Sequence, residues 1–310
     1  MVLMVRLPRP ALSRPAALAA GCVSLAAIAL AALTVLHDQL TQSASQVARG
    51  APVPLILAVT AFGLGLLLSG LAWRAGLGAA GIPVSRTDAA ARFAAGSLAN
   101  SLLPFHLGTV LRLALFGHAA KDVRVVTGIA TAIGSVGLLT MAALVATCAV
   151  VGPLPLWPAA LLGGGAIVAA LVSTVAARSS MRSHGLAAMT CGHQGFRVIA
   201  VALICSAYEV PNPILTGMAV VVALEIAGVL PLTPGNLGVS TAATSFALIA
   251  HGVPTTLALT VGIALPALET TTSIVVGLGA ACYLTRVAGP HGRALTPRAQ
   301  PTPAIAFDAG

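Results

Sequence analysis

Long apolar runs recur along the whole chain, and each is bounded by arginine or another polar residue. Two clear examples are residues 53–73, followed by Arg74 and Arg86, and residues 255–285, followed by Arg286. A run of about 20 apolar residues is long enough to cross the hydrocarbon core of a membrane as a helix. The sequence therefore predicts an all-α protein, a polytopic bundle of transmembrane helices.

The composition excludes a soluble globular domain. Only 7% of the 310 residues are charged and 58% are hydrophobic, whereas a soluble domain is about 25% charged. The net charge of +9 comes from residues at the ends of apolar runs. It therefore indicates membrane topology and contact with anionic headgroups, and we expect no nucleic-acid partner. The five cysteines are scattered and predict no disulfide framework.

Full spans are expected at six places, near residues 15–36, 53–73, 125–151, 157–177, 196–210 and 255–285. Basic residues concentrate on the cytoplasmic side of membrane proteins. This rule puts both termini in the cytoplasm, together with a basic loop that runs from Arg178 to Arg197. Residues 1–14 then form a cytoplasmic segment, residues 15–285 one transmembrane domain, and residues 286–310 a disordered tail.

Two further apolar segments are interrupted. Residues 93–117 contain Asn100, Pro104 and His106 near their middle. A proline inside a helix costs ~3 kcal/mol, and broken backbone cannot face lipid. Basic residues follow this segment as well as precede it. We therefore favour a re-entrant pair of half-helices over a single crossing, and a total of seven or eight spans remains the alternative.

The second interrupted segment covers residues 214–250 and is broken at residues 231–236. It must start and finish outside if the last span is to end in the cytoplasm. The two breaks share the pattern Pro-x-x-Leu-Gly, at Pro104–Gly108 and Pro234–Gly238. Paired broken helices in inverted orientation point to a binding site near the membrane midplane.

The interrupted segments resemble the two motifs of the lysylphosphatidylglycerol synthase transmembrane family, a flippase-like membrane domain. The first motif matches at Asn100, Pro104, Gly108 and Arg112, and the second at Pro231, Thr233, Pro234, Gly235, Leu237, Gly238 and Val239. His106 stands where arginine is usual, and Thr109 and Thr241 where acids are usual. The chain thus resembles a divergent, stand-alone member without the synthase domain.

This resemblance implies lipid translocation between leaflets. We expect a multi-pass protein of the bacterial plasma (inner) membrane whose partners are membrane lipids with anionic headgroups. A secondary transporter of small solutes and a non-transporting accessory membrane protein are the alternatives. The sequence holds no nucleophile–base motif, phosphate loop or nucleotide fingerprint. We therefore expect no enzyme activity, no cofactor and no metal.

Three charged residues inside apolar segments are the main candidates for a substrate site: Arg112, Glu225 and Glu269. A charge at the centre of a transmembrane helix costs about 2.5–3.5 kcal/mol. The planar guanidinium of Arg112 suits phosphate; it could instead pair with Glu225 or Glu269, or reach the cytoplasmic interface. Either glutamate could contact a headgroup, belong to a structural pair or be protonated.

Polar residues in and beside the breaks complete the predicted site. The first break contributes Asn100, His106 and Thr109, and the second contributes Thr233, Gly235 and Asn236.

Overall fold

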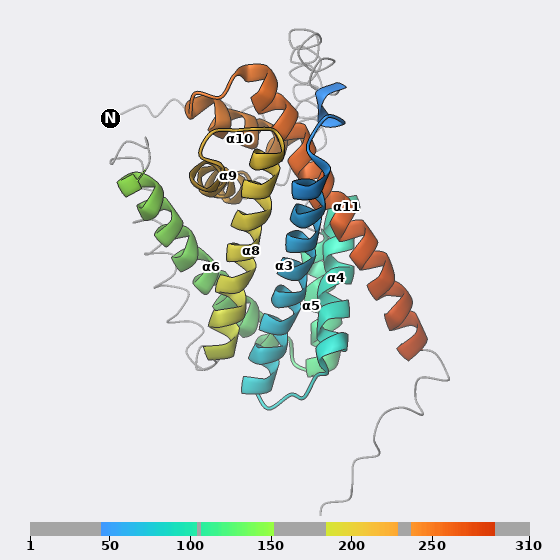
Figure 1. The fold of residues 1–310 in the computed structure, drawn as a ribbon. Coiled ribbons are helices and arrows are strands. Elements are labelled where there is room, and N and C mark those ends of the chain that lie inside the picture. Colours follow the sequence, from blue (N-terminus) through green and yellow to red (C-terminus); the bar gives the residue numbers. More distant parts are fainter. Residues whose placement is uncertain (1–44, 104–106, 152–183, 229–236, 289–310) are drawn as a thin grey trace, which may run out of the picture.

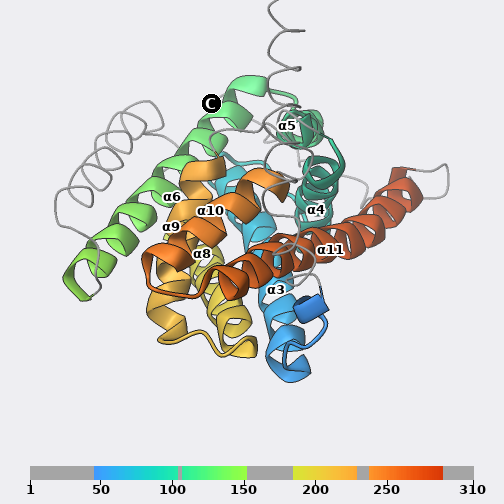
Figure 2. The same ribbon diagram turned by 90° about the horizontal axis from the view of Figure 1, so that it is seen from above.

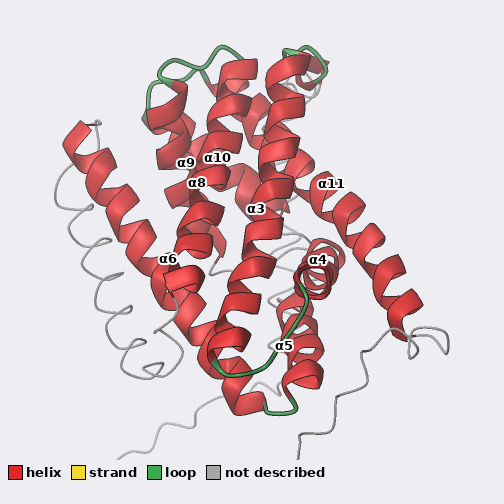
Figure 3. Ribbon diagram, turned by 60° about the horizontal axis from the view of Figure 1, so that its bottom comes forward, coloured by secondary structure: helices red, strands yellow, loops and turns green. Residues whose placement is uncertain are grey.

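The computed structural model describes residues 45–103, 107–151, 184–228 and 237–288. Within these ranges the regular structure is entirely helical, which confirms the all-α prediction (Figure 3). The helices, in chain order, are α3 (Pro52–Ala79), α4 (Arg86–Leu102), α5 (Leu107–Ala120), α6 (Val123–Val151), α8 (His184–Ala207), α9 (Pro213–Gly228), α10 (Leu237–Ala250) and α11 (Thr255–Ala288).

Among the described residues, four helices are long and apolar enough to cross a membrane: α3, α6, α8 and α11. Three shorter helices, α5, α9 and α10, are also apolar. The expected spans near residues 15–36 and 157–177 and the tail beyond residue 288 lie outside the described part of the chain. The structure thus supports an integral membrane protein with four candidate spans.

The start of α8 corrects the predicted boundary between loop and span. The basic stretch up to Arg197 was expected to be a cytoplasmic loop, followed by a short span over residues 196–210. Instead, α8 begins at His184, so Arg197 lies well inside the helix. The first half of α8 packs closely on α3, where Leu186 is buried and its side chain lies beside Gly76.

Helices α3 and α8 form an antiparallel pair at the centre of the fold (Figure 1). At one end the backbone amide of Ala51 donates to the carbonyl oxygen of Ala207 over 3.1 Å. At the other end Gly76 meets Leu186. We call this second end the basic end, because Arg74, Arg86, Lys121, Arg124 and Arg286 lie at helix termini there.

Two helical hairpins enter the fold from opposite ends (Figure 1). The first, α4–α5, starts after α3 at the basic end and returns there before α6. The second, α9–α10, starts after α8 at the other end and returns there before α11. The interruption expected in residues 93–117 falls between Leu102 and Leu107. The second interruption, at residues 229–236, lies outside the described residues.

The contacts between helices repeat in the two halves of the chain. Helices α3–α6 form one half and α8–α11 the other, each built as a long helix, a hairpin and a second long helix. In the first half, α3 and α4 both pack on α11, the final helix of the second half. In the second half, α8 and α9 both pack on α6, the final helix of the first half. In Figures 1 and 2, α6 and α11 lie on opposite sides of the α3–α8 pair. The two halves thus have inverted topologies.

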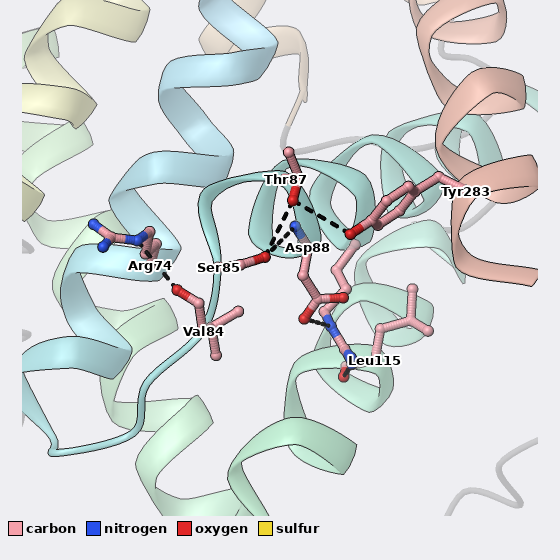
Figure 4. A network of polar contacts seen from close by, with 8 residues as sticks. Arg74, Val84, Ser85, Thr87, Asp88, Leu115 and Tyr283 are labelled. Carbon is pink, nitrogen blue, oxygen red and sulfur yellow. Dashed lines mark hydrogen bonds and ion pairs between the residues drawn. The ribbon is translucent and has the colours of Figure 1, made fainter. Parts of the chain in front are cut away.

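A side-chain network fixes the start of α4 at the basic end (Figure 4). The hydroxyl of Ser85 caps the helix by accepting from the backbone amide of Asp88 over 3.1 Å. Asp88 lies in the first turn, where its negative charge interacts favourably with the helix dipole. It also pairs over 2.9 Å with Arg92, which donates to the carbonyl oxygen of Leu115. This chain of contacts holds α5 against α4.

The same network reaches α3 and α11. The hydroxyl of Thr87 lies 3.3 Å from that of Tyr283 on α11, and Nε of Arg74 donates over 3.1 Å to the carbonyl oxygen of Val84. The α4–α5 hairpin is therefore anchored to both neighbouring long helices at the basic end.

Glycines allow the two helices of the first hairpin to approach each other closely. A Cβ atom on Gly108 would clash with the carbonyl oxygen of Gly96 and with the backbone of Asn100. A Cβ atom on Gly96 would lie 2.8 Å from that of Arg112. The backbone contact between α4 and α5 therefore requires glycine at both positions.

We expect Gly108→Ala to destabilise the protein, because overpacking of a close contact costs about 1–3 kcal/mol. Gly117→Ala in the same helix is the matched control, since no atom lies within 4 Å of its added Cβ. Thermal unfolding in detergent should show a lower midpoint for Gly108→Ala and an unchanged or slightly higher one for Gly117→Ala. Equal midpoints would contradict the described packing of α4 on α5.

Candidate functional site

A cavity of about 800 Å³ lies between the central helices and α6. Helices α3, α4, α5, α6, α8 and α9 all contribute to its wall. Its polar lining residues are Ser69, Thr109, Arg112, Thr190, His193, Gln194 and Glu225. Two of the predicted site residues with charge, Arg112 and Glu225, therefore face one cavity.

Arg112 lies on α5 and is held by the facing helix α4. Its guanidinium carbon lies 3.9 Å from the centre of the Phe93 ring, in a cation–π contact. One terminal nitrogen donates over 3.2 Å to the hydroxyl of Ser97. The Nε atom is buried and has no hydrogen-bond partner among the described residues. Within the same ranges no carboxylate forms an ion pair with Arg112.

Asn100 and Thr109 brace the first turn of α5. The side-chain oxygen of Asn100 accepts from the backbone amide of Thr109 over 3.0 Å, and its nitrogen lies 3.4 Å from the Thr109 hydroxyl. These bonds satisfy donors at the helix start that have no partner within the helix. Asn100 is therefore bound to the hairpin itself, whereas Thr109 also lines the cavity.

The two predicted glutamates share one partner, Arg197 on α8. A terminal nitrogen of Arg197 makes a direct ion pair with Glu225 of α9, and its Nε lies 3.7 Å from Glu269 of α11. Gln194 also donates to Glu225, over 3.3 Å. We call these four residues and His193 the Arg197 cluster. It joins three helices that are separated in the sequence.

His193 completes the cluster on the side of α3. Its Nδ1 atom lies 3.1 Å from the carbonyl oxygen of Gly65. Because a carbonyl only accepts, Nδ1 carries the proton in this contact. A Cβ atom on Gly65 would lie 3.2 Å from the same ring nitrogen, so a larger residue there would crowd His193. His193 and Arg197 are four residues apart and therefore lie on one face of α8.

These contacts correct one part of the predicted site. Arg112 was considered as the ion-pair partner of Glu225 or Glu269, but Arg197 occupies that position. Sequence reasoning missed Arg197, His193 and Gln194, because they follow other basic residues and were assigned to a loop. Their spacing of three and four residues was the available signal, since it places them on one helical face.

Four predicted site residues lie outside the described part of the chain: His106, Thr233, Gly235 and Asn236. Among the described residues, no group of three or more His, Cys, Asp or Glu side chains is close enough to hold a metal ion.

Comparison with known proteins finds no matching family model, no similar curated protein and no similar solved structure. The resemblance to a lipid-flippase family therefore rests on the motif residues alone, and the functional argument rests on the site.

We expect Arg197→Gln to destabilise the protein more than loss of either glutamate, because it leaves two carboxylates without a partner. Removal of one partner from a buried ion pair costs about 3–5 kcal/mol. The lower end applies here, since the Glu225 and Glu269 side chains are 34% and 36% exposed. Thermal unfolding in detergent should show a lower midpoint for Arg197→Gln. Arg49→Gln, at an exposed position, is the control and should leave the midpoint unchanged.

A further variant tests whether the lower stability of Arg197→Gln comes from the two unpaired carboxylates. Combining Arg197→Gln with Glu225→Gln and Glu269→Gln removes the unpaired charges and should restore part of the unfolding midpoint. A triple variant no more stable than Arg197→Gln alone would contradict the pairing.

Proposed function

We propose that this protein moves a phosphate-bearing lipid between the two leaflets of its membrane. The observation that carries the proposal is the cavity wall, which joins an extended apolar surface to a guanidinium that has no carboxylate partner among the described residues. A phospholipid has the same division, with an anionic phosphate at one end and hydrocarbon chains at the other.

The polar part of the wall suits the headgroup. The guanidinium of Arg112 has a buried, unpaired Nε–H, and such a donor costs free energy unless a ligand or water satisfies it. Arginine binds phosphate through two parallel hydrogen bonds. Thr109, one turn earlier on the same helix, adds a hydroxyl beside it.

The apolar part of the wall suits the acyl chains. Helix α6 contributes only hydrocarbon side chains, methionine and glycine: Ala130, Ile133, Gly134, Gly137, Leu138, Met141 and Val145. A hydrophilic solute would gain nothing from this surface. The apolar face of α6 therefore favours a lipid over a small-solute substrate.

The inverted halves supply a means of exposing the site to either side. We infer that α4–α5 and α9–α10 are re-entrant hairpins that enter the membrane from opposite sides, within about six full spans. Proteins built from inverted repeats expose a midplane site alternately to the two sides by rocking one repeat against the other. The positive-inside rule assigns the basic end to the cytoplasm.

The motif resemblance supports the same function. Arg112 belongs to the first motif shared with flippase-like domains, and Leu237 and Gly238 at the start of α10 belong to the second. Neither motif includes a nucleotide site, so we propose that an ion gradient or the lipid gradient supplies the energy.

We expect Arg112→Ala to lower the rate of lipid exchange about tenfold or more, since hydrogen bonds to charged groups contribute about 1.5–3 kcal/mol. The measurement uses purified protein in liposomes that contain a fluorescent phospholipid, with quenching of the outer leaflet as the readout. Arg112→Lys keeps the positive charge but loses the planar guanidinium that can bind phosphate through two hydrogen bonds. Its exchange rate should therefore lie between those of the native protein and Arg112→Ala. Arg124→Ala is the matched control, because this side chain is exposed at the basic end.

Exchange by the native protein no faster than in empty liposomes would overturn lipid translocation. Exchange that Arg112→Ala leaves unchanged would overturn the site while keeping the function.

A further inference from the structure

The charged side chains that line the large cavity and a small one beside it balance one another, and an anionic ligand would upset that balance. Arg112 and Arg197 carry two positive charges, and Glu225 and Glu269 carry two negative ones. The lipid phosphate of the proposed function, on which this inference rests, would add a negative charge. A net charge inside a membrane is costly, so binding of the anion favours uptake of a cation.

We propose that Glu269 binds a proton when an anionic lipid binds at Arg112, so that proton and lipid cross the membrane together. The step balances without a further reactant. One proton enters from the side that supplies the lipid, neutralises one carboxylate, and leaves on the side that receives the lipid.

The contacts of the two glutamates identify Glu269 as the one that takes the proton. Glu225 has a direct ion pair with Arg197 and a hydrogen bond from Gln194, and a proton on its carboxylate would weaken both contacts. Glu269 has only the more distant contact of 3.7 Å and no hydrogen bond among the described residues. Protonation of Glu269 therefore breaks the fewest interactions.

A second cavity gives this carboxyl a connection to the lipid site. It measures about 30 Å³ and is lined by Phe62, Gly65, Leu66, His193, Arg197, Glu269 and Ser273. That volume can hold a single water molecule. His193 lines both this cavity and the large one. His193 therefore stands between the Glu269 cavity and the lipid site.

No other described ionisable group competes for this role. The helices packed against α11 are α3, α4, α8 and α10. Helix α10 contains no ionisable residue, and the charges of α3 and α4 lie toward the basic end. On α8, Arg197 and His193 face Glu269 across the small cavity. A second proton on His193 would place another cation beside Arg197 and is therefore disfavoured.

Proton binding and anion binding must then strengthen each other by the same factor. An anionic lipid should bind more tightly at low pH, and it should raise the pH at which Glu269 loses its proton. A zwitterionic lipid brings no net charge and should change neither quantity.

The first experiment detects the proton directly and needs no transport. The infrared carbonyl stretch of a protonated carboxyl is followed during a pH titration of the full chain in detergent, with short-chain phosphatidylglycerol or phosphatidylcholine added. We expect a titrating band that Glu269→Gln removes and that Glu209→Gln, at an exposed position, retains. Phosphatidylglycerol should move its midpoint upward by about one pH unit. No such band, or a band that persists in Glu269→Gln, would overturn the proposal.

The second experiment measures coupling. Liposomes with a pH difference of one unit, and with the membrane voltage held at zero by potassium and valinomycin, receive labelled phosphatidylglycerol. One proton moved per lipid should enrich the label about tenfold in the leaflet that faces the less acidic side, because one pH unit is a tenfold ratio of protons. Labelled phosphatidylcholine, and a sodium gradient at equal pH, should give an even distribution.

The outcomes separate this inference from the proposed function. Rapid exchange of phosphatidylglycerol that stays evenly distributed would keep lipid translocation and overturn proton coupling. Absence of exchange together with a carboxyl band that phosphatidylglycerol shifts would overturn lipid translocation and keep the linked proton site. Enrichment driven by sodium would also overturn the assignment of a proton.

Discussion

A single guanidinium holds the centre of this fold together. Arg197 contacts Glu225 and Glu269, so α8, α9 and α11 are tied to one point although each comes from a different part of the chain. In water such contacts would contribute little. Inside a membrane the unpaired charges have no better partner, so the ion pairs fix which helices must be neighbours. The position of the second hairpin relative to α8 depends on this constraint.

Small side chains allow the helices of this fold to approach one another closely. At several close contacts between helices, one helix presents glycine: Gly70 meets Ala90, Gly217 meets Ala202 and Gly277 meets Leu98. Helices in lipid gain no hydrophobic drive toward each other, and close backbone approach increases the van der Waals contact that holds them. The glycine contacts thus place the helices, and the polar contacts select their partners.

The elements with the simplest sequence pattern could be predicted from the sequence. The runs over residues 53–73, 125–151 and 255–285 correspond to α3, α6 and α11, because an uninterrupted apolar run has one stable structure in lipid. The break in residues 93–117 was likewise visible, since Pro104 stands there among polar residues and proline disfavours a helix interior. Helix α8 was misplaced because its inward-facing polar residues lower its mean hydropathy to 1.3, below the 2.3 of α3.

The pairing within the site could not be predicted for a different reason. Two arginines and two glutamates line the two cavities, and sequence spacing leaves open which arginine contacts which acid. Only the packing of α8 on α9 and α11 decides it. Arg112 lines the cavity, and it has no carboxylate partner among the described residues because Arg197 is the partner of both glutamates.

The order of synthesis makes the Arg197 contacts a problem for assembly as well as for the finished fold. During translation, α8 emerges before either of its acidic partners, and Glu225 follows 28 residues after Arg197. A helix that carries an unpaired arginine enters lipid reluctantly. We therefore expect the insertion machinery to retain α8 beside the already folded α3 until α9, and finally α11, bring the carboxylates. Assembly in the membrane would then be complete, and the topology fixed, only after α11 has inserted.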